Sequence, residues 1–192
     1  MNIGLFFGSF NPIHTGHLIL AQTALNDTDL DRIWFVVSPQ NPLKQKKNLI
    51  SEFDRLTMVE LAVEWNKDFH ASNVEFALPR PSYTIDTLTM LADKYRSYHF
   101  SLIMGEDNLQ YLHKWKNHEA ILNYYTIYLY PRVDTPPSPL DAHPSIQRFE
   151  APLLNISATY IRETLQAGKS IRYLVPQAVE EYILWKGLYV WA

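Results

Sequence analysis

The sequence predicts an α/β fold with an open, mostly parallel sheet, helices on both faces and a small helical portion at the C-terminal end. Short apolar runs alternate with segments of helical periodicity, which is typical of strand-helix-strand units. The apolar runs are nearly continuous, as expected of strands covered by helices on both faces. With 192 residues the chain has the length of one domain, and we expect residues 1–192 to form a single domain.

The predicted strands are short hydrophobic runs. Residues 3–7, 33–37, 100–104 and 124–130 are the four clear candidates, and residues 73–78 are a weaker fifth. Between the first two runs, residues 15–26 are predicted to be helical. Residues 52–65 follow as a second helix, in which Leu56, Val59, Ala62 and Val63 share one stripe.

Capping residues mark the remaining helices. Ser82 is a candidate N-cap for a third helix, after which apolar residues recur at helical spacing. Ser157 is expected to cap a helix that ends at Gly168, and Pro176 to open one that runs to Gly187. Five prolines between residues 131 and 144 predict an extended loop there.

Composition excludes several classes of protein. The formal net charge is -3, which argues against a partner that is a nucleic-acid polymer, and the absence of cysteine excludes disulfides and cysteine-bound zinc. No apolar run approaches the ~20 residues that span a bilayer, so no membrane association is expected. No signal peptide is visible at the N-terminus, and a cytoplasmic location is expected on that ground alone.

The turn after the first strand carries the densest group of functional residues. Gly8 permits close approach of the main chain to an anion, and the following helix N-terminus adds a partial positive charge. His14 and His17 are three residues apart at the start of that helix, so their rings can lie on one side of its first turn. The pattern predicts a phosphate site. The alternatives are an incidental histidine cap and a metal pair, although no nearby carboxylate completes a metal site.

This first motif resembles a known signature. Residues 8–17 read Gly-Ser-Phe-Asn-Pro-Ile-His-Thr-Gly-His, which resembles the HxGH nucleotidyltransferase superfamily and, within it, bacterial nicotinate-nucleotide adenylyltransferases. Phe7 stands where that family more often has a first glycine. A second motif at residues 156–162 resembles the family's Ile-Ser-Ser-Thr-x-Ile-Arg, with Ala158 in place of the middle serine. There Ser157 and Thr159 offer hydroxyls at a helix N-terminus and Arg162 offers a bidentate fork; the alternative is a plain serine cap with a surface arginine.

Further segments extend the resemblance over essentially the whole chain. They are residues 38–44, 80–87, 105–108, 112–115, 173–176 and 187–189. The resemblance implies a Rossmann-like nucleotidyltransferase domain. Asp107 follows a buried strand, where it could hold a ribose hydroxyl, and Trp115 could stack on a pyridine ring. Residues 80–87 resemble the stretch that binds the pyridine mononucleotide in this family. The alternative is that Ser82 and Thr84 only cap a helix and that Tyr83 only packs.

The implied site residues fall into three overlapping groups. The ATP-binding group is Gly8, Ser9, Phe10, His14, His17, Gly105, Asp107, Ser157, Thr159 and Arg162. The group that binds nicotinate mononucleotide is Ser9, Phe10, Asn11, Lys44, Tyr83, Thr84, Thr87 and Trp115. The catalytic group is His14, His17, Lys44 and Arg162, and no residue is assigned to a metal.

The resemblance implies a reaction of NAD biosynthesis, in which AMP passes from ATP to nicotinate mononucleotide and pyrophosphate leaves. Mg²⁺ would be held mainly through the ATP phosphates. The alternatives are a nicotinamide mononucleotide or phosphopantetheine adenylyltransferase, a non-catalytic nucleotide sensor, and a metal-binding module built on His14 and His17. The sequence leaves self-association into a homo-oligomer open.

Overall fold

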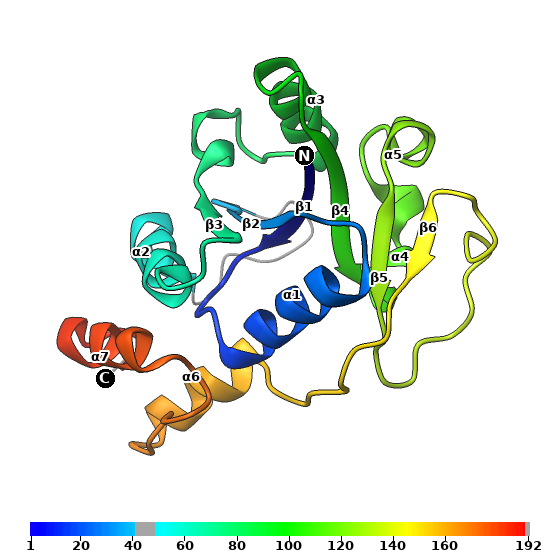
Figure 1. Ribbon diagram of the computed structural model, residues 1–192. Helices are drawn as coiled ribbons and strands as arrows, with labels where there is room; N and C mark the ends of the chain where they lie inside the picture. Colours follow the sequence, from blue (N-terminus) through cyan, green and yellow to red (C-terminus); the bar gives the residue numbers. More distant parts are fainter. Residues whose placement is uncertain (41–48, 191–192) are drawn as a thin grey trace.

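The computed structural model describes residues 1–40 and 49–190. Its centre is a six-stranded sheet with the strand order β3-β2-β1-β4-β5-β6 (Figure 1). Each pairing between neighbouring strands is parallel. The strands are β1 Asn2–Gly8, β2 Arg32–Val37, β3 Phe69–Ser72, β4 His99–Gly105, β5 Ile127–Tyr130 and β6 Ile146–Arg148. The predicted α/β fold with a parallel sheet is confirmed.

The helices cover both faces of this sheet (Figure 1). On one face lie α1 Thr15–Asp27, α2 Glu52–Val63, α6 Ala158–Gln166 and α7 Gln177–Lys186. On the other lie α3 Thr84–Lys94, α4 Glu106–Leu109 and α5 His118–Tyr124. Two short 3₁₀ helices, Val74–Ala77 and Leu112–Lys114, complete the set in the described ranges.

Alternating strand residues supply the two hydrophobic cores. In β2, Ile33 and Phe35 pack with α1 and α2, whereas Trp34 and Val36 pack with α3. These four side chains are 9% exposed or less. Successive side chains of a strand point to opposite faces, so a strand buried on both sides must be apolar throughout. This requirement explains the continuous runs in the sequence.

Three of the expected elements differ from the structure. The strand expected at residues 73–78 is wrong: β3 is Phe69–Ser72, paired from Ile33↔Phe69, and Val74–Ala77 is a 3₁₀ helix. A short run with alternating apolar residues does not by itself distinguish a strand from a helical turn. The last central strand begins at Ile127, because Tyr124 still belongs to α5. The N-cap of α3 is Tyr83 and not Ser82.

The expected helix ends near the C-terminus are confirmed. The Ser157 hydroxyl accepts a hydrogen bond from the Tyr160 N–H at 3.1 Å and caps α6. Gly168 and Gly187 adopt positive φ angles of 67° and 62° just after α6 and α7, a conformation that glycine adopts without strain. Residues 131–144 contain turns but no helix or strand, as the prolines predict.

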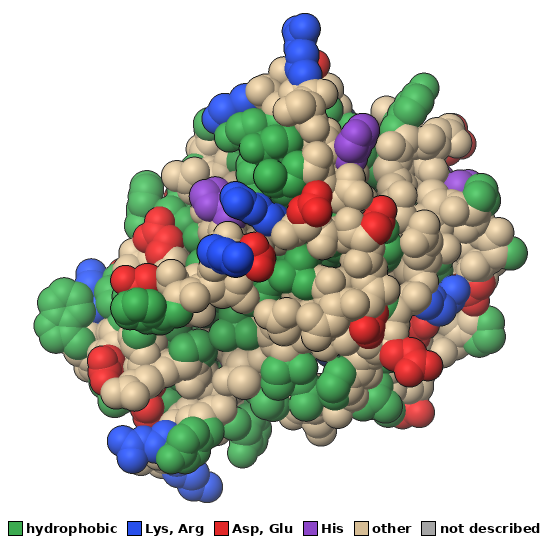
Figure 2. Space-filling model, in the orientation of Figure 1, with side chains coloured by type: hydrophobic (Ala, Val, Ile, Leu, Met, Phe, Trp, Pro, Cys, Tyr) green, Lys and Arg blue, Asp and Glu red, His purple; other side chains and the backbone are tan. Residues whose placement is uncertain are grey.

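The surface carries mixed charge and some exposed aromatic residues. On the face drawn in Figure 2, basic and acidic side chains are interspersed, and hydrophobic side chains gather over α2 and α7. Phe53 of α2, Trp65 just after α2 and Trp185 of α7 are exposed. Tyr189, by contrast, is 1% exposed and belongs to the core. No helix in the described ranges is long and apolar enough to cross a membrane.

Candidate active site

The candidate site lies at the carboxyl ends of the two central strands. From β1 the chain passes to β2 on one side of the sheet, and from β4 it passes to β5 on the other. Such a switch point leaves a crevice outside the strand ends, where open α/β sheets bind ligands. The first motif follows β1 directly, and the Gly105-Glu106-Asp107 turn follows β4.

Close packing explains the glycine at the end of β1. A Cβ atom on Gly8 would lie 2.7 Å from the Phe10 ring, which is too close for an ordinary contact. Phe10 adopts a positive φ of 44° and is 3% exposed, with its ring edge-on to the His17 ring at 5.2 Å between centroids. The Phe10 side chain is therefore core, and only its main chain is placed to meet a ligand.

His14 and His17 form a stacked pair at the start of α1. Their ring centroids are 3.7 Å apart and the ring planes differ by 25°, so the rings do lie on one side of the first turn. The main-chain N–H of His14 donates a hydrogen bond to the ring Nδ1 of His17 at 3.2 Å. Because Nδ1 accepts this bond, the proton of a neutral His17 ring is on Nε2, which makes Nε2 a donor.

Burial keeps the His14 ring neutral. Desolvation, with the nearby Arg132 charge as a smaller contribution, lowers the pKa of His14 to about 4. The buried Nδ1 of His14 has no hydrogen-bond partner among residues 1–40 and 49–190. A Cβ atom on Gly16 would lie 3.0 Å from this nitrogen, so Gly16 leaves room for the ring. His14 is thus placed as a neutral imidazole at neutral pH.

The second motif packs beside the first. Arg162 donates from Nη1 to the Asn11 carbonyl at 2.7 Å and from Nη2 to the Thr159 hydroxyl at 3.1 Å. A Cβ atom on Gly16 would lie 3.8 Å from Cβ of Ile156, which places the N-termini of α1 and α6 side by side. Two helix N-termini and one guanidinium therefore converge on the crevice, an arrangement suited to a polyanion.

Asn11 accepts hydrogen bonds from two residues near the C-terminal end of the chain. Its side-chain Oδ1 accepts a hydrogen bond from the buried Tyr189 hydroxyl at 3.0 Å, and its carbonyl accepts from Arg162. Burial raises the pKa of Tyr189, which keeps the hydroxyl protonated as a donor. The C-terminal segment thus fixes the loop that carries the first motif.

Asp107 stands at the end of β4, as expected from the sequence. Its carboxylate lies 3.7 Å from Arg132 Nε and accepts a hydrogen bond from the Asn108 amide at 3.3 Å. The Arg132 guanidinium also lies over the Tyr130 ring, 5.1 Å from its centroid. A Cβ atom on Gly105 would contact the Asp107 carboxylate, so only glycine leaves this acid in place.

A cavity of about 300 Å³ opens beside this crevice, between β1, β4 and the start of α3. Of the residues predicted from sequence, Gly8, Tyr83, Thr84, Gly105 and Trp115 border it. Glu75, Ser82, Tyr111 and Lys116 also border it and were not among the predicted contacts. The mixture of aromatic rings, hydroxyls and charged groups is typical of a small-molecule pocket.

Two predicted residues take other positions. Thr87 has no exposed surface and donates its hydroxyl to Glu75 at 2.9 Å, so it can act on a ligand only through other groups. Lys44 lies outside the described residues, as do Lys46 and Lys47. The Ser9 carbonyl accepts a hydrogen bond from Arg55, which leaves its N–H and hydroxyl as the groups that can face a ligand.

Arg55 organises the loops around the site. This arginine has no exposed surface and donates to four carbonyl oxygens: Ile50 at 3.2 Å, Ser9 at 2.5 Å, Ser38 at 2.8 Å and Pro39 at 3.1 Å. Its guanidinium thereby joins the loop after β1 to the loop after β2. On α2 it looks like one more charged residue of a solvated face, so no sequence signal distinguishes it.

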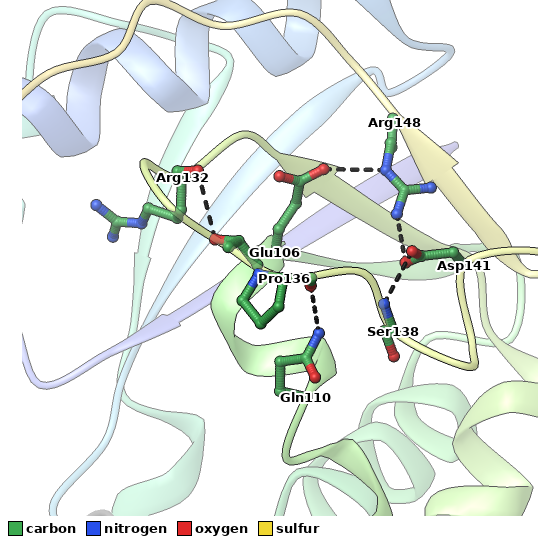
Figure 3. Close-up of polar contacts among 8 residues, drawn as sticks. Glu106, Gln110, Arg132, Pro136, Ser138, Asp141 and Arg148 are labelled. Atoms are coloured by element: carbon green, nitrogen blue, oxygen red, sulfur yellow. Dashed lines mark hydrogen bonds and ion pairs between the residues drawn. The ribbon is translucent and has the colours of Figure 1, made fainter.

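The proline-rich loop is tied to the rest of the sheet (Figure 3). Arg148 of β6 bridges Glu106 at 2.9 Å and Asp141 at 2.6 Å, and the Gln110 amide donates to the Pro136 carbonyl at 2.7 Å. The Arg132 guanidinium points away from this network in Figure 3. The loop is thus anchored at α4 while Arg132, at its start, faces the crevice beside Asp107.

Comparison with known proteins agrees with this geometry. Residues 5–164 match the family model described as cytidylyltransferase-like. A protein of Cytophaga hutchinsonii named probable nicotinate-nucleotide adenylyltransferase is 56% identical over 98% of this chain and 98% of its own length. A protein of the same name from Flavobacterium johnsoniae is 51% identical over 95% of this chain and 96% of its own length.

Solved structures show the same fold. The Plasmodium falciparum nicotinic acid mononucleotide adenylyltransferase complexed with APC aligns with a TM-score of 0.81 and 19% identity, over 98% of this chain and 96% of that one. The same enzyme complexed with NaAD aligns with a TM-score of 0.80 and 20% identity, over 98% and 97% of the two chains. At these identities the likeness supports the fold alone. The family model and the two bacterial relatives carry the assignment: this chain belongs to the cytidylyltransferase-like family and, within it, to the nicotinate-nucleotide adenylyltransferases.

Proposed function

We propose that this protein transfers AMP from ATP to nicotinate mononucleotide, giving nicotinate adenine dinucleotide and pyrophosphate, a step of NAD biosynthesis. The observation that carries this proposal is the meeting of the two helix N-termini at the switch point, with a pocket for a second ligand beside them. Family membership supports the same reaction. In the family's reaction, a phosphate oxygen of the mononucleotide forms a bond to the α-phosphorus of ATP, and the bond to the leaving pyrophosphate breaks.

This chemistry needs no nucleophilic side chain, because the attacking phosphate is already anionic. Catalysis then comes from positioning, for which well-oriented reactions recover ~7–11 kcal/mol, and from stabilisation of developing charge. We assign His17 Nε2 to the α-phosphate, with His14 beside it. Ser157, Thr159 and Arg162 take the β- and γ-phosphates at the N-terminus of α6, and Lys44 adds positive charge.

The acceptor is assigned to the cavity. Tyr83, Thr84 and Trp115 border it and would meet the pyridine ring, while main-chain groups of Ser9 and Phe10 would meet both substrates. Gly105 and Asp107 would bind the ribose of ATP. We also propose that residues 1–192 form one nucleotidyltransferase domain, since both hydrophobic cores pack on one sheet. A cytoplasmic location and the homo-oligomer stay predictions.

We propose that Mg²⁺ binds mainly through the ATP phosphates, where it neutralises charge, as is usual for this ion. The chain's own part is to leave those phosphates accessible between α1 and α6. Residues 1–40 and 49–190 contain no group of three or more His, Cys, Asp or Glu side chains that could hold a metal ion.

The test is pyrophosphate release from ATP and Mg²⁺ with nicotinate mononucleotide or nicotinamide mononucleotide supplied separately. We expect release with nicotinate mononucleotide, much less with nicotinamide mononucleotide, and none without an acceptor. Equal use of the two would keep the chemistry and contradict the expected preference for nicotinate mononucleotide. ATP binding without release in either case would favour the nucleotide-sensor alternative and refute the proposed function.

A further inference from the structure

A buried carboxylate lies at the edge of the cavity. Glu75 belongs to the 3₁₀ helix between β3 and α3, is 2% exposed and borders the cavity. Its Oε2 accepts a hydrogen bond from the Ser82 hydroxyl at 2.8 Å, and its Oε1 accepts one from the Thr87 hydroxyl at 2.9 Å. None of the roles assigned above uses this acid.

Burying such a group is unfavourable unless it is fully bonded. Desolvation raises the pKa of Glu75, and hydrogen bonds from Ser82, Ser38 and Thr87 oppose that rise. Each hydrogen bond that the carboxylate accepts holds the donating hydroxyl in place. Two of these donors, the Ser82 and Thr87 hydroxyls, lie on either side of one turn.

That turn is the start of α3. Ser82 precedes the N-cap Tyr83, and Thr87 lies one turn into the helix, so the two bonds to the Glu75 carboxylate span residues 83–86. The first N–H groups of a helix have no partner within it and are available to a ligand. Tyr83 and Thr84 border the cavity and lie between the two residues whose hydroxyls Glu75 holds.

We propose that Glu75 is a positioning residue of the acceptor pocket, holding Ser82 and Thr87 so that the Tyr83–Thr84 turn is preset for the pyridine mononucleotide. This inference rests on the proposed function, because it takes the cavity as the acceptor site. Glu75 contacts no reacting atom in this account. Its effect is on the affinity for one substrate, and ATP, bound at the α1 and α6 N-termini, should not sense it.

The test uses single variants of the full chain in the pyrophosphate-release assay. Thr87→Val removes one hydroxyl from Glu75 and keeps the side-chain shape. Thr89→Val is the matched control, because Thr89 is on the same helix and its exposed side chain bonds only the Ile85 carbonyl among the described contacts. Glu75→Ala removes the carboxylate, and Glu75→Gln keeps its shape and part of its hydrogen bonding. KM for each substrate, kcat and the melting temperature are measured for all four.

The expected result is a change confined to the acceptor. Thr87→Val should raise KM for nicotinate mononucleotide about tenfold, the scale of one hydrogen bond to a charged group. KM for ATP and kcat should stay within about twofold, which corresponds to about 0.4 kcal/mol. Glu75→Gln should keep the acceptor KM closer to that of the unchanged protein than Glu75→Ala does, and Thr89→Val should leave it unaltered.

The opposite results are equally clear. If Thr87→Val and Glu75→Ala leave the acceptor KM unchanged, or raise the KM of both substrates alike, Glu75 has only a structural role and the inference is overturned. Thr87→Val keeps the test valid if Glu75→Ala does not fold. A wild-type protein with no turnover refutes the proposed function and this inference with it, whereas turnover with an unaltered acceptor KM in the variants refutes this inference alone.

Discussion

Arg55→Met should lower the stability of the protein by an amount that follows from the hydrogen bonds it removes. Methionine fills the space of the aliphatic stem but removes all four hydrogen bonds to the carbonyls of Ser9, Ser38, Pro39 and Ile50. A hydrogen bond to a charged group is worth ~1.5–3 kcal/mol when its partner stays buried, and less where water can enter. At about 1 kcal/mol for each bond, the loss is about 4 kcal/mol, within the range for breaking a buried charged network.

This loss is a large part of the total stability. A domain of this size is stable by ~5–15 kcal/mol, and each kcal/mol shifts its melting temperature by ~2–4 °C. The variant should therefore melt about 8–16 °C lower and still fold at room temperature. Because the loops after β1 and β2 lose their common anchor, turnover should fall as well, even where the protein is folded.

The measurement is urea unfolding followed by circular dichroism, with the assay of pyrophosphate release beside it. Arg32→Met is the control, because Arg32 is exposed at the start of β2 and its loss should cost less than ~0.5 kcal/mol. Arg55→Lys should be intermediate, since an ammonium has three donors and no planar fork. A loss under ~1 kcal/mol for Arg55→Met, with unchanged activity, would show that the four bonds are replaced by water and refute the reasoning.

Three further predictions concern the site itself. His17→Ala should lower kcat by ~10²–10³, the scale for one preorganised donor, and steady-state rates close to those of the wild type would remove His17 from the α-phosphate. The pKa of His14 is about 4 in the folded protein, against an unfolded value of ~6.5, so the unfolded chain binds more protons between these values. The free energy of unfolding should fall as pH decreases from ~6.5 to ~4, by up to about 3 kcal/mol, and His14→Gln should flatten this slope in urea titrations at several pH values. Gly105→Ala should push the Asp107 carboxylate aside and raise KM for ATP about tenfold, the scale of one charge-assisted bond. Gly168→Ala is the control, because a Cβ atom there meets open space and the change should only lower stability. Equal KM values for ATP in the two variants would contradict the role of Asp107.

The sequence alone determined the fold and the position of the first motif. The continuous apolar runs must be strands buried on both faces, and Ser157, Gly168 and Gly187 mark helix ends through local backbone chemistry. A motif that directly follows a parallel strand must lie at the carboxyl edge of the sheet. These inferences need only neighbours in the chain, which is why they agree with the structure.

Only the tertiary structure decided which charged residues are buried and what they hold. Arg55 and Glu75 have the residue types of a solvated surface, and their burial depends on carbonyls and hydroxyls contributed by other segments. The 3₁₀ turn at residues 74–77 replaces the expected strand because β3 forms earlier in the chain, against β2. The contact of Arg162 with Asn11, between distant parts of the sequence, completes the site. Such contacts follow from packing in three dimensions, and no periodicity or spacing along the chain encodes them.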